Sequence, residues 1–322
     1  MRSSYCLLLP WVVLWFVCAC NNPSAQHKGG SATPYGDAGR HKTYKGEVKV
    51  FADYSLAPVL RQHKEVFEYL YDSVKLNISY TFGDDALDSF RQQKNSVLII
   101  TRALLASEKE QMKNRDTLYP REVMVCYDAV ALIAGIKSPF SYFDVDDLRK
   151  LFTAGAGDKI KLVFEHQKSG AVTQVLNAMG FNGKPTDRLY ALHSADEVIQ
   201  YCTRQTDAVG FVPFAMLSDN DDPNVQKMLT QVKILSLRLQ NEKGETVMAS
   251  ATQSDIAAGV YPLARPVYAI IRYGHGDSPA WLFVNFLYRE KGARIFLKAG
   301  LVPARMPERQ INVNTGPLEV IP

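Results

Sequence analysis

The chain has 322 residues, of which 47% are hydrophobic and 22% charged, with a formal net charge of +4. These are the proportions of an ordinary soluble globular protein, long enough for one large or two medium domains. The small net charge does not by itself decide about nucleic acid. Because no basic run is interleaved with aromatic residues, we expect no nucleic-acid partner.

The first 19 residues have the pattern of an export signal. Arg2 supplies the positive start, and the apolar run over residues 6–17 is too short to cross a bilayer, which takes about 20 apolar residues. The run ends in VCAC, which resembles the bacterial lipobox, with Cys20 as the acylated cysteine. We therefore predict a lipoprotein signal peptide over residues 1–19 and a lipid on Cys20. An ordinary secretory signal that is cut near Ala19 stays open as an alternative.

Residues 20–45 are rich in glycine, serine, proline and short polar residues and show no apolar periodicity. Such a segment cannot bury enough apolar surface to offset the entropy lost on ordering. We interpret it as a flexible tether between the lipid and the folded body. The expected location is periplasmic, at a membrane of the cell envelope, and the sequence does not decide between the inner and the outer membrane.

Beyond the signal and Cys20, the remaining cysteines are Cys126 and Cys202, each inside an apolar segment. Buried free thiols are the commoner case in such segments, and a disulfide between the two is the alternative. The six histidines lack metal-ligand spacing, and no Ser/His/Asp or Cys/His arrangement is apparent. We expect no metal, no cofactor and no enzymatic activity.

Apolar runs alternate with amphipathic segments in the first part of the body. This strand–helix–strand–helix order implies parallel strands. Ser107 is a candidate N-cap, and Glu110 three residues later would complete a capping box. We expect strands over residues 48–52, 77–82 and 97–101 and helices over residues 56–71, 86–90 and from 107 onward.

The apolar segment over residues 123–136 predicts one long strand with a single charge, Asp128. A buried carboxylate is costly unless it is paired, so we favour a hydrogen-bonded structural role for Asp128 over a pocket role. The predicted class is α/β with mostly parallel sheets. The remaining expected elements are helices over residues 145–151, 171–179, 195–203 and 280–299, the last ending at Gly300, and strands over residues 162–164, 208–212, 232–239 and 266–272.

A ligand site in such sheets lies where the carboxyl ends of strands lead into helix N-termini. These N-termini offer unpaired N–H groups and a partial positive charge, which suit an oxyanion. The candidate loops are residues 53–55, 83–85, 101–102 and 168–171.

An ordered set of motifs now points to a family. In chain order the motifs are FADYSLAPVL, IITRALLASEKE, CYDAVALIAG, DVDDLRKLFTAG, KSGAVTQV, DAVGFVPFAML, YPLARPVYAIIR and AGLVPA. The set is similar to the phosphate-binding subunits of bacterial ABC phosphate transporters, the PstS-like branch of the type II periplasmic binding proteins. The resemblance covers residues 48–304.

The resemblance implies two lobes, each a mostly parallel sheet flanked by helices, joined by two hinge crossovers near residues 123–136 and 261–272. Lobe I would comprise residues 46–130 and 262–322, and lobe II residues 131–261. A hinge that closes on the ligand is the implied motion. The implied protein is a monomer that delivers its solute to ABC permease subunits and catalyses nothing itself.

The family's first phosphate loop matches Tyr54, Ser55 and Leu56, and its Ser-Gly-Thr loop matches Ser169, Gly170 and Ala171, where the threonine is missing. Four further residues depart from the family pattern. Asp84 and Asp85 stand where the family has serine, Arg102 where it has an aspartate, and Glu165 where it has an arginine.

These departures bear on the ligand, because carboxylates beside a phosphate dianion repel it. Arg102 could hold the anion from the opposite lobe, with Glu165 pairing it or accepting a proton, which keeps phosphate or another small oxyanion as the ligand. Alternatively, Arg102, Asp84 and Glu165 form an interlobe salt-bridge set without any ligand. The first case predicts a substrate-binding lipoprotein of an ABC importer. The second predicts a non-transport sensor or interaction module with a degenerate anion site.

Overall fold

The computed structural model describes residues 44–82, 84–93, 96–116, 119–152, 160–181, 189–241, 243–272 and 278–307. The predicted signal peptide, Cys20 and nearly all of the predicted tether lie outside these ranges. Within them, no helix is both long enough and apolar enough to cross a membrane.

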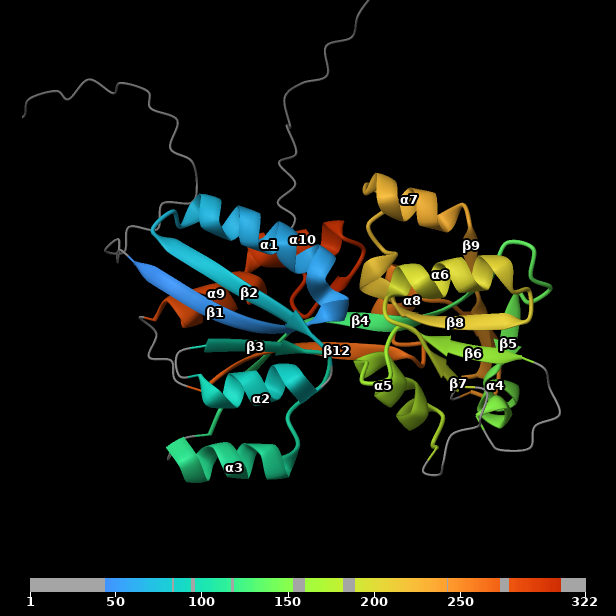
Figure 1. Cartoon of the computed structure of the whole chain (residues 1–322), viewed down its shortest axis with the longest axis horizontal. Helices are drawn as coiled ribbons and strands as arrows, with labels where there is room; N and C mark the ends of the chain where they lie inside the picture. Colours follow the sequence, from blue (N-terminus) through green and yellow to red (C-terminus); the bar gives the residue numbers. More distant parts are fainter. Residues whose placement is uncertain are drawn as a thin grey trace, which may run out of the picture. The chain divides into compact units, whose positions relative to one another are not determined.

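The main sheet consists of two parallel groups of strands that are joined by antiparallel pairing in the middle (Figure 1). Its order is β2-β1-β3-β12-β4-β8-β6-β7. We call β1, β2 and β3 the first half of the sheet and β6, β7 and β8 the second half. The bounds are β1 (Gly46–Asp53), β2 (Val74–Thr81), β3 (Ser96–Ile100), β4 (Arg121–Gly135), β6 (Lys161–Phe164), β7 (Leu189–Ala191), β8 (Ala208–Pro213) and β12 (Ala264–Ile271). This arrangement confirms the predicted α/β class.

The long strand β4 belongs to both halves, as the unbroken apolar run predicts. Its first part pairs with β12 and its last part with β8 and with β9 (Val232–Ile234), all antiparallel. Nearly every residue of β4 from Val125 onward is buried, because the strand is covered on both faces. In the pairing of β4 with β12, Asp128 lies directly opposite Arg265.

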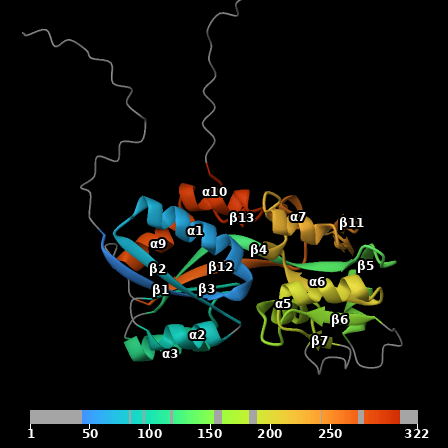
Figure 2. The ribbon, with the colours of Figure 1, turned by 45° about the horizontal axis from the view of Figure 1, so that its top comes forward.

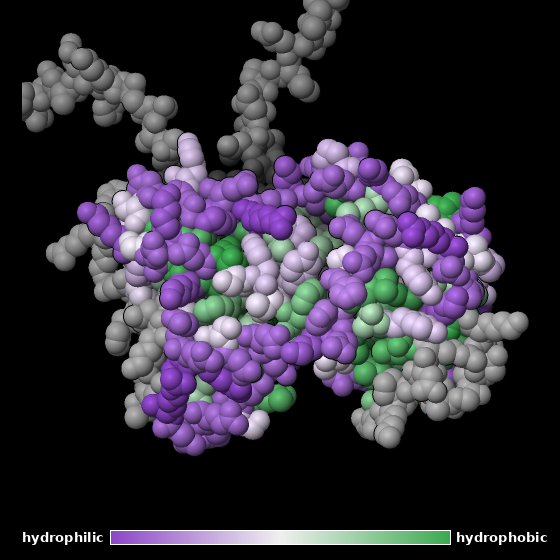
Figure 3. All heavy atoms as spheres, viewed as in Figure 1, coloured by the Kyte–Doolittle hydropathy of each residue, from purple (hydrophilic) through white to green (hydrophobic). Residues whose placement is uncertain are grey.

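Helices cover both faces of each half (Figures 1 and 2). In the first half, α1 packs with α9 and α10, while α2 and α3 cover the other face and present a hydrophilic outer surface (Figure 3). In the second half, α5 and α6 lie on opposite faces. The helices are α1 (Ala57–Leu70), α2 (Asp84–Gln92), α3 (Ala106–Asp116), α4 (Val145–Leu151), α5 (Gly170–Ala178), α6 (Ala195–Arg204), α7 (Pro223–Leu229), α8 (Gln253–Ala257), α9 (Pro279–Tyr288) and α10 (Glu290–Lys298), with the 3-10 turns η1 (Tyr54–Leu56) and η2 (Phe214–Met216).

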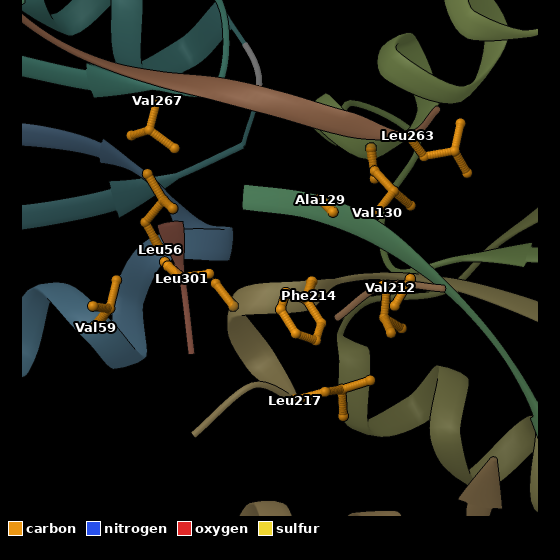
Figure 4. Packing of buried hydrophobic residues seen from close by; sticks show 14 of the residues in the cluster. Leu56, Val59, Ala129, Val130, Val212, Phe214, Leu217, Leu263, Val267 and Leu301 are labelled. Carbon is orange, nitrogen blue, oxygen red and sulfur yellow. The ribbon is translucent and has the colours of Figure 1, made fainter. Parts of the chain in front are cut away.

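One hydrophobic core extends through both halves of the sheet. Leu56 from η1, Phe214 from η2 and Leu301 belong to the same buried cluster as Ala129 of β4 (Figure 4). A smaller cluster around Phe90 lies between α2, α3 and the sheet. Cys126 and Cys202 are buried and free, as expected from their apolar surroundings.

The helix predicted over residues 280–299 is instead two helices, α9 and α10, which are separated at Arg289 in extended backbone. The chain reverses so tightly that a Cβ at Gly292 would lie 2.2 Å from the carbonyl oxygen of Phe286, so glycine is needed there. The predicted end at Gly300 is confirmed, since this residue has φ of +80° and follows α10 as its C′ residue.

Two other predictions were wrong in detail. The segment over residues 232–239 is not one strand, because its two parts pair with different partners. Residues up to Leu235, whose N–H donates to the Leu132 carbonyl at 2.8 Å, lie along β4, and the pairing partners change from Ser236 onward. The chain continues as β10 (Ser236–Gln240) in a separate sheet with β5 (Tyr142–Asp144) and β11 (Thr246–Ala249). Ser107 is not an N-cap, because α3 already begins at Ala106, and the Glu108 carboxylate accepts the Leu105 N–H at 2.7 Å instead.

Candidate functional site

A pocket of about 420 Å³ lies at the carboxyl ends of strands from both halves of the sheet. Asp53 ends β1, Thr101 and Arg102 follow β3, and Gly170 begins α5 after β6. Asp84 and Asp85, at the start of α2, complete one wall. Parallel pairing brings these strand ends to one edge of each half, so the pocket lies where α/β sheets place their ligands.

The cations at the mouth of the pocket are already paired. The Arg102 guanidinium donates to Glu108 at 2.8 Å and to Asp84 at 3.0 Å. The hydrogen bond to Glu108 is the main reason that the pKa of Arg102 is raised above its ordinary value. Lys168 forms an ion pair with Asp85 at 3.2 Å. The Arg102–Asp84 part of the expected salt-bridge set is therefore present, but Glu108 takes the place expected for Glu165.

Glu165 lies deeper, with only 2% of its surface exposed. Its Oε1 accepts a hydrogen bond from the Ser169 hydroxyl at 2.5 Å, and its Oε2 has no hydrogen-bond partner among the described residues. Burial raises the pKa of Glu165 to about 7, so near neutral pH a large fraction of this carboxyl group is uncharged. The Ser169 hydroxyl also accepts the Ala171 N–H at 2.9 Å and so caps α5.

The predicted first loop is divided between different surroundings. The Ser55 N–H donates to the Asp53 carboxylate at 2.9 Å, so this backbone donor is engaged within the chain. Leu56 belongs to the hydrophobic core. Tyr54 lines a second cavity, of about 650 Å³, between α1, α6 and α7. Of the ten predicted ligand-binding residues, Asp84, Asp85, Arg102 and Gly170 line the first pocket.

An arginine that the sequence reasoning missed is buried beside Gly170, which lines this pocket. Arg265 of β12 is fully buried and donates from Nε and Nη2 to the Asp128 carboxylate at 3.0 and 2.7 Å. Burial alone would lower the pKa of Arg265, but the carboxylates of Asp128 and Asp53 raise it above its ordinary value. Asp128 thus has the paired structural role that we favoured. Each residue is an isolated charge in an apolar strand, and that pattern could have indicated the pair.

The remaining edge of this guanidinium faces the start of α5. Its Nη1 has no hydrogen-bond partner among the described residues. A Cβ added to Gly170 would lie 3.4 Å from this nitrogen, 3.2 Å from Asp53 Oδ2 and 2.8 Å from Thr101 Oγ1. The side chains of Arg265, Asp53 and Thr101 therefore converge on Gly170. Asp53, Thr101 and Gly170 line the pocket.

Aromatic rings connect the ends of β2 and β6 beside the pocket. Phe82 stacks on His166 with ring centroids 4.2 Å apart and 9° between the planes. Phe82 also contacts Tyr54, at a centroid distance of 5.0 Å. Together with the Lys168–Asp85 ion pair, the stack joins the two sides of the pocket.

No cluster of three or more potential metal ligands occurs within the described ranges. What the pocket offers is a helix N-terminus, hydroxyl groups, a buried guanidinium edge and several carboxylates. Such groups bind a small polar solute by hydrogen bonds and charge.

The fold and this pocket define a two-lobed solute-binding protein. The PBP superfamily domain matches residues 31–291, so the chain belongs to this family. Its members are non-enzymatic binding proteins. No curated protein sequence shows significant similarity to the chain.

Solved structures share the fold at low sequence identity. A Clostridium perfringens protein assigned as a phosphate ABC transporter substrate-binding protein, with bound phosphate, has a TM-score of 0.64 at 18% identity, over 81% of this chain and 100% of that one. An ABC-type phosphate transport receptor from Vibrio cholerae has a TM-score of 0.59 at 18% identity, over 80% and 100%. PstS from Borrelia burgdorferi gives 0.53 at 15%, over 80% and 99%. The family match and these shared folds confirm the resemblance noted in the sequence.

Proposed function

We propose that the protein is an extracytoplasmic substrate-binding lipoprotein that captures a small oxyanion, inorganic phosphate first among the candidates, for an ABC importer. The observation that carries this proposal is the pocket where the ends of β1 and β3 meet the N-terminus of α5. Backbone N–H groups at a helix start favour an anion whatever the side chains are. The bound phosphate in the Clostridium perfringens relative supports the same class of solute.

The predicted lobes, 46–130 with 262–322 and 131–261, and the hinge motion are part of this proposal. Asp84, Asp85, Arg102 and Gly170 would border the solute from the two sides. Delivery to permease subunits and a monomeric state follow from the same role.

A second candidate is a non-transport sensor or interaction module with a degenerate anion site. One specific observation favours it: carboxyl groups of the chain itself accept hydrogen bonds from two donors that we expected to bind the anion. Asp53 accepts a hydrogen bond from the Ser55 N–H, and Glu165 accepts one from the Ser169 hydroxyl. If these bonds persist, the loops have little left to offer a solute.

Titration calorimetry with phosphate, sulfate and molybdate separates the two candidates. Protein dialysed free of phosphate should give saturable heat with phosphate. By linkage, phosphate at about 100 times its Kd should also stabilise the fold by about 2.7 kcal/mol. Heat with sulfate or molybdate alone would keep the oxyanion class and correct the solute. No heat and no stabilisation with any of the three would contradict the transport role and leave the sensor candidate.

The lipid on Cys20 can be tested separately from the solute. Cells fed a labelled fatty acid should incorporate the label into the parent protein, whereas Cys20→Ser should lose the label and the membrane association, because no other acylation site is predicted. One acyl chain gives only marginal membrane binding, so firm anchoring requires at least two chains on this residue. Cys126→Ser, which changes a buried free thiol, is the matched control and should keep the label. No label on the parent protein would indicate an ordinary secretory signal, and equal labelling of Cys20→Ser would place the lipid on another residue.

A further inference from the structure

We propose that Arg265, from the crossover strand β12, supplies the counter-charge for the captured oxyanion and takes the role that the family resemblance assigns to position 165. The inference rests on the proposed function, because it names a binding residue for the same site. It adds a residue that lies a hundred positions further along the chain.

Arg265 has a hydrogen-bond donor group that no described residue uses. A guanidinium has five N–H donors, and Asp128 uses those on Nε and Nη2. Nη1 is buried and has no acceptor among the described residues. A buried donor without an acceptor is costly, so an oxygen atom that reaches Nη1 gains more than an exposed contact would.

Nη1 of Arg265 lies close to the start of α5. The space that a Cβ of Gly170 would fill lies 3.4 Å from Nη1 and 2.8 Å from the Thr101 hydroxyl. Gly170 is the first residue of α5, a helix of nine residues, and it lines the pocket. An anion at this helix start therefore has a charged donor on one side and a hydroxyl on the other, at the positive end of the helix dipole. The missing side chain of Gly170 is what allows the approach.

Carboxyl groups as well as the guanidinium surround the space in front of Nη1. Asp53 Oδ2 faces the same space and opposes an anion. Glu165 opposes it less, because burial raises its pKa to about 7. Asp128 holds the guanidinium from the far side, and Nη1 points away from that bond toward α5. Arg265 is thus placed to offset Asp53 at the point of contact.

Arg102, the arginine suggested by the sequence, is less suited to this role. Three of its hydrogen bonds go to the carboxylates of Glu108 and Asp84, and one goes to the Ala103 carbonyl. A third of its side chain is exposed, so water screens its charge. An anion would have to compete with two carboxylates for Arg102, whereas Nη1 of Arg265 is hydrogen-bonded to no acceptor among the described residues.

Phosphate titrations of full-length variants test the assignment. Gly170→Ala puts a methyl group in front of Nη1 and leaves the Arg265–Asp128 pair intact. Arg265→Lys keeps a charge beside Asp128 but loses the free nitrogen. Each should bind phosphate about 10- to 100-fold more weakly than the parent, as expected for a lost hydrogen bond to a charged group. Arg102→Gln should cost clearly less than either, and Arg294→Gln, in an exposed ion pair on α10, should match the parent.

The possible outcomes are separable. If the parent binds phosphate but Gly170→Ala binds equally well, or if Arg102→Gln loses as much as Gly170→Ala, the assignment of Arg265 is overturned and the proposed function stands. If the parent binds none of the three oxyanions, the proposed function itself fails. Should Arg265→Lys fold poorly, unchanged binding by Gly170→Ala still overturns the assignment, because a methyl group at this helix start is tolerated if the Thr101 hydroxyl turns aside.

Discussion

Replacing Asp128 with alanine should lower the free energy of unfolding by about 3–5 kcal/mol, measured by urea denaturation. The reason is that Arg265 stays buried and charged while its partner is removed. The substitution also removes the acceptor of the Ala215 N–H, which now donates to Asp128 at 2.9 Å. Both strands that join the halves of the sheet lose their central contact, so we expect the largest single-residue effect here.

The matched control is Asp147→Ala, which removes a carboxylate from an exposed pair with Lys150. Exposed pairs contribute about 0–1 kcal/mol, so this variant should stay within 1 kcal/mol of the parent. The double variant Asp128→Leu with Arg265→Met should recover much of the loss, since a buried pair can be replaced by apolar groups of similar size. A loss in Asp128→Ala no larger than that of the control would show that Arg265 finds another partner.

Glu165→Gln should stabilise the protein relative to the parent at alkaline pH and not at acidic pH. The pKa of Glu165 is raised from its ordinary value of 4.5 to about 7 by burial. The stability that its proton provides is fully present below pH 4.5 and is lost as the pH rises through 7. A pKa raised from 4.5 to about 7 corresponds to about 3 kcal/mol. The difference between variant and parent should therefore grow by about 3 kcal/mol between pH 4.5 and pH 8.

The difference between the two proteins is the quantity to measure, because His63 acts in the opposite direction. Burial lowers the pKa of His63 from 6.5 to about 4, so its contribution is present above pH 6.5 and is lost as the pH falls. This contribution is common to both proteins and cancels. Glu245→Gln, at an exposed position, serves as the control and should follow the parent at every pH. A pH-independent difference for Glu165→Gln would mean that Glu165 remains ionised in the fold.

Much of the fold could be predicted from local patterns. The long apolar segment gave β4, and alternating apolar and amphipathic segments gave the order of elements in both halves. The break at Arg289 could not be predicted, because Gly292 is needed only where the chain packs against the end of α9. Similarly, the segment over residues 232–239 divides into two strands because its first part pairs with β4 and its second part with β5 and β11, partners that are distant in the sequence or follow it.

The candidate site was less predictable for the same physical reason. The family resemblance assigns the counter-charge to position 165, where this chain has Glu165 in place of an arginine. The fold brings Arg265 next to that place through the antiparallel pairing of β4 with β12, which has no local signature. The resemblance includes the motif YPLARPVY, which contains Arg265, but the motif does not indicate that the Arg265 side chain lies against Gly170.

The Phe82–His166 stack and the Lys168–Asp85 ion pair have a kinetic consequence. Under the proposed hinge motion, a solute would enter while these bridging contacts are broken, so the association rate would depend on how often they open. The apparent Kd would then equal the intrinsic value divided by the fraction of molecules that are open, and each tenfold reduction of that fraction would weaken capture tenfold. The strength of these two contacts would thus contribute to the solute concentration at which the protein becomes half-saturated.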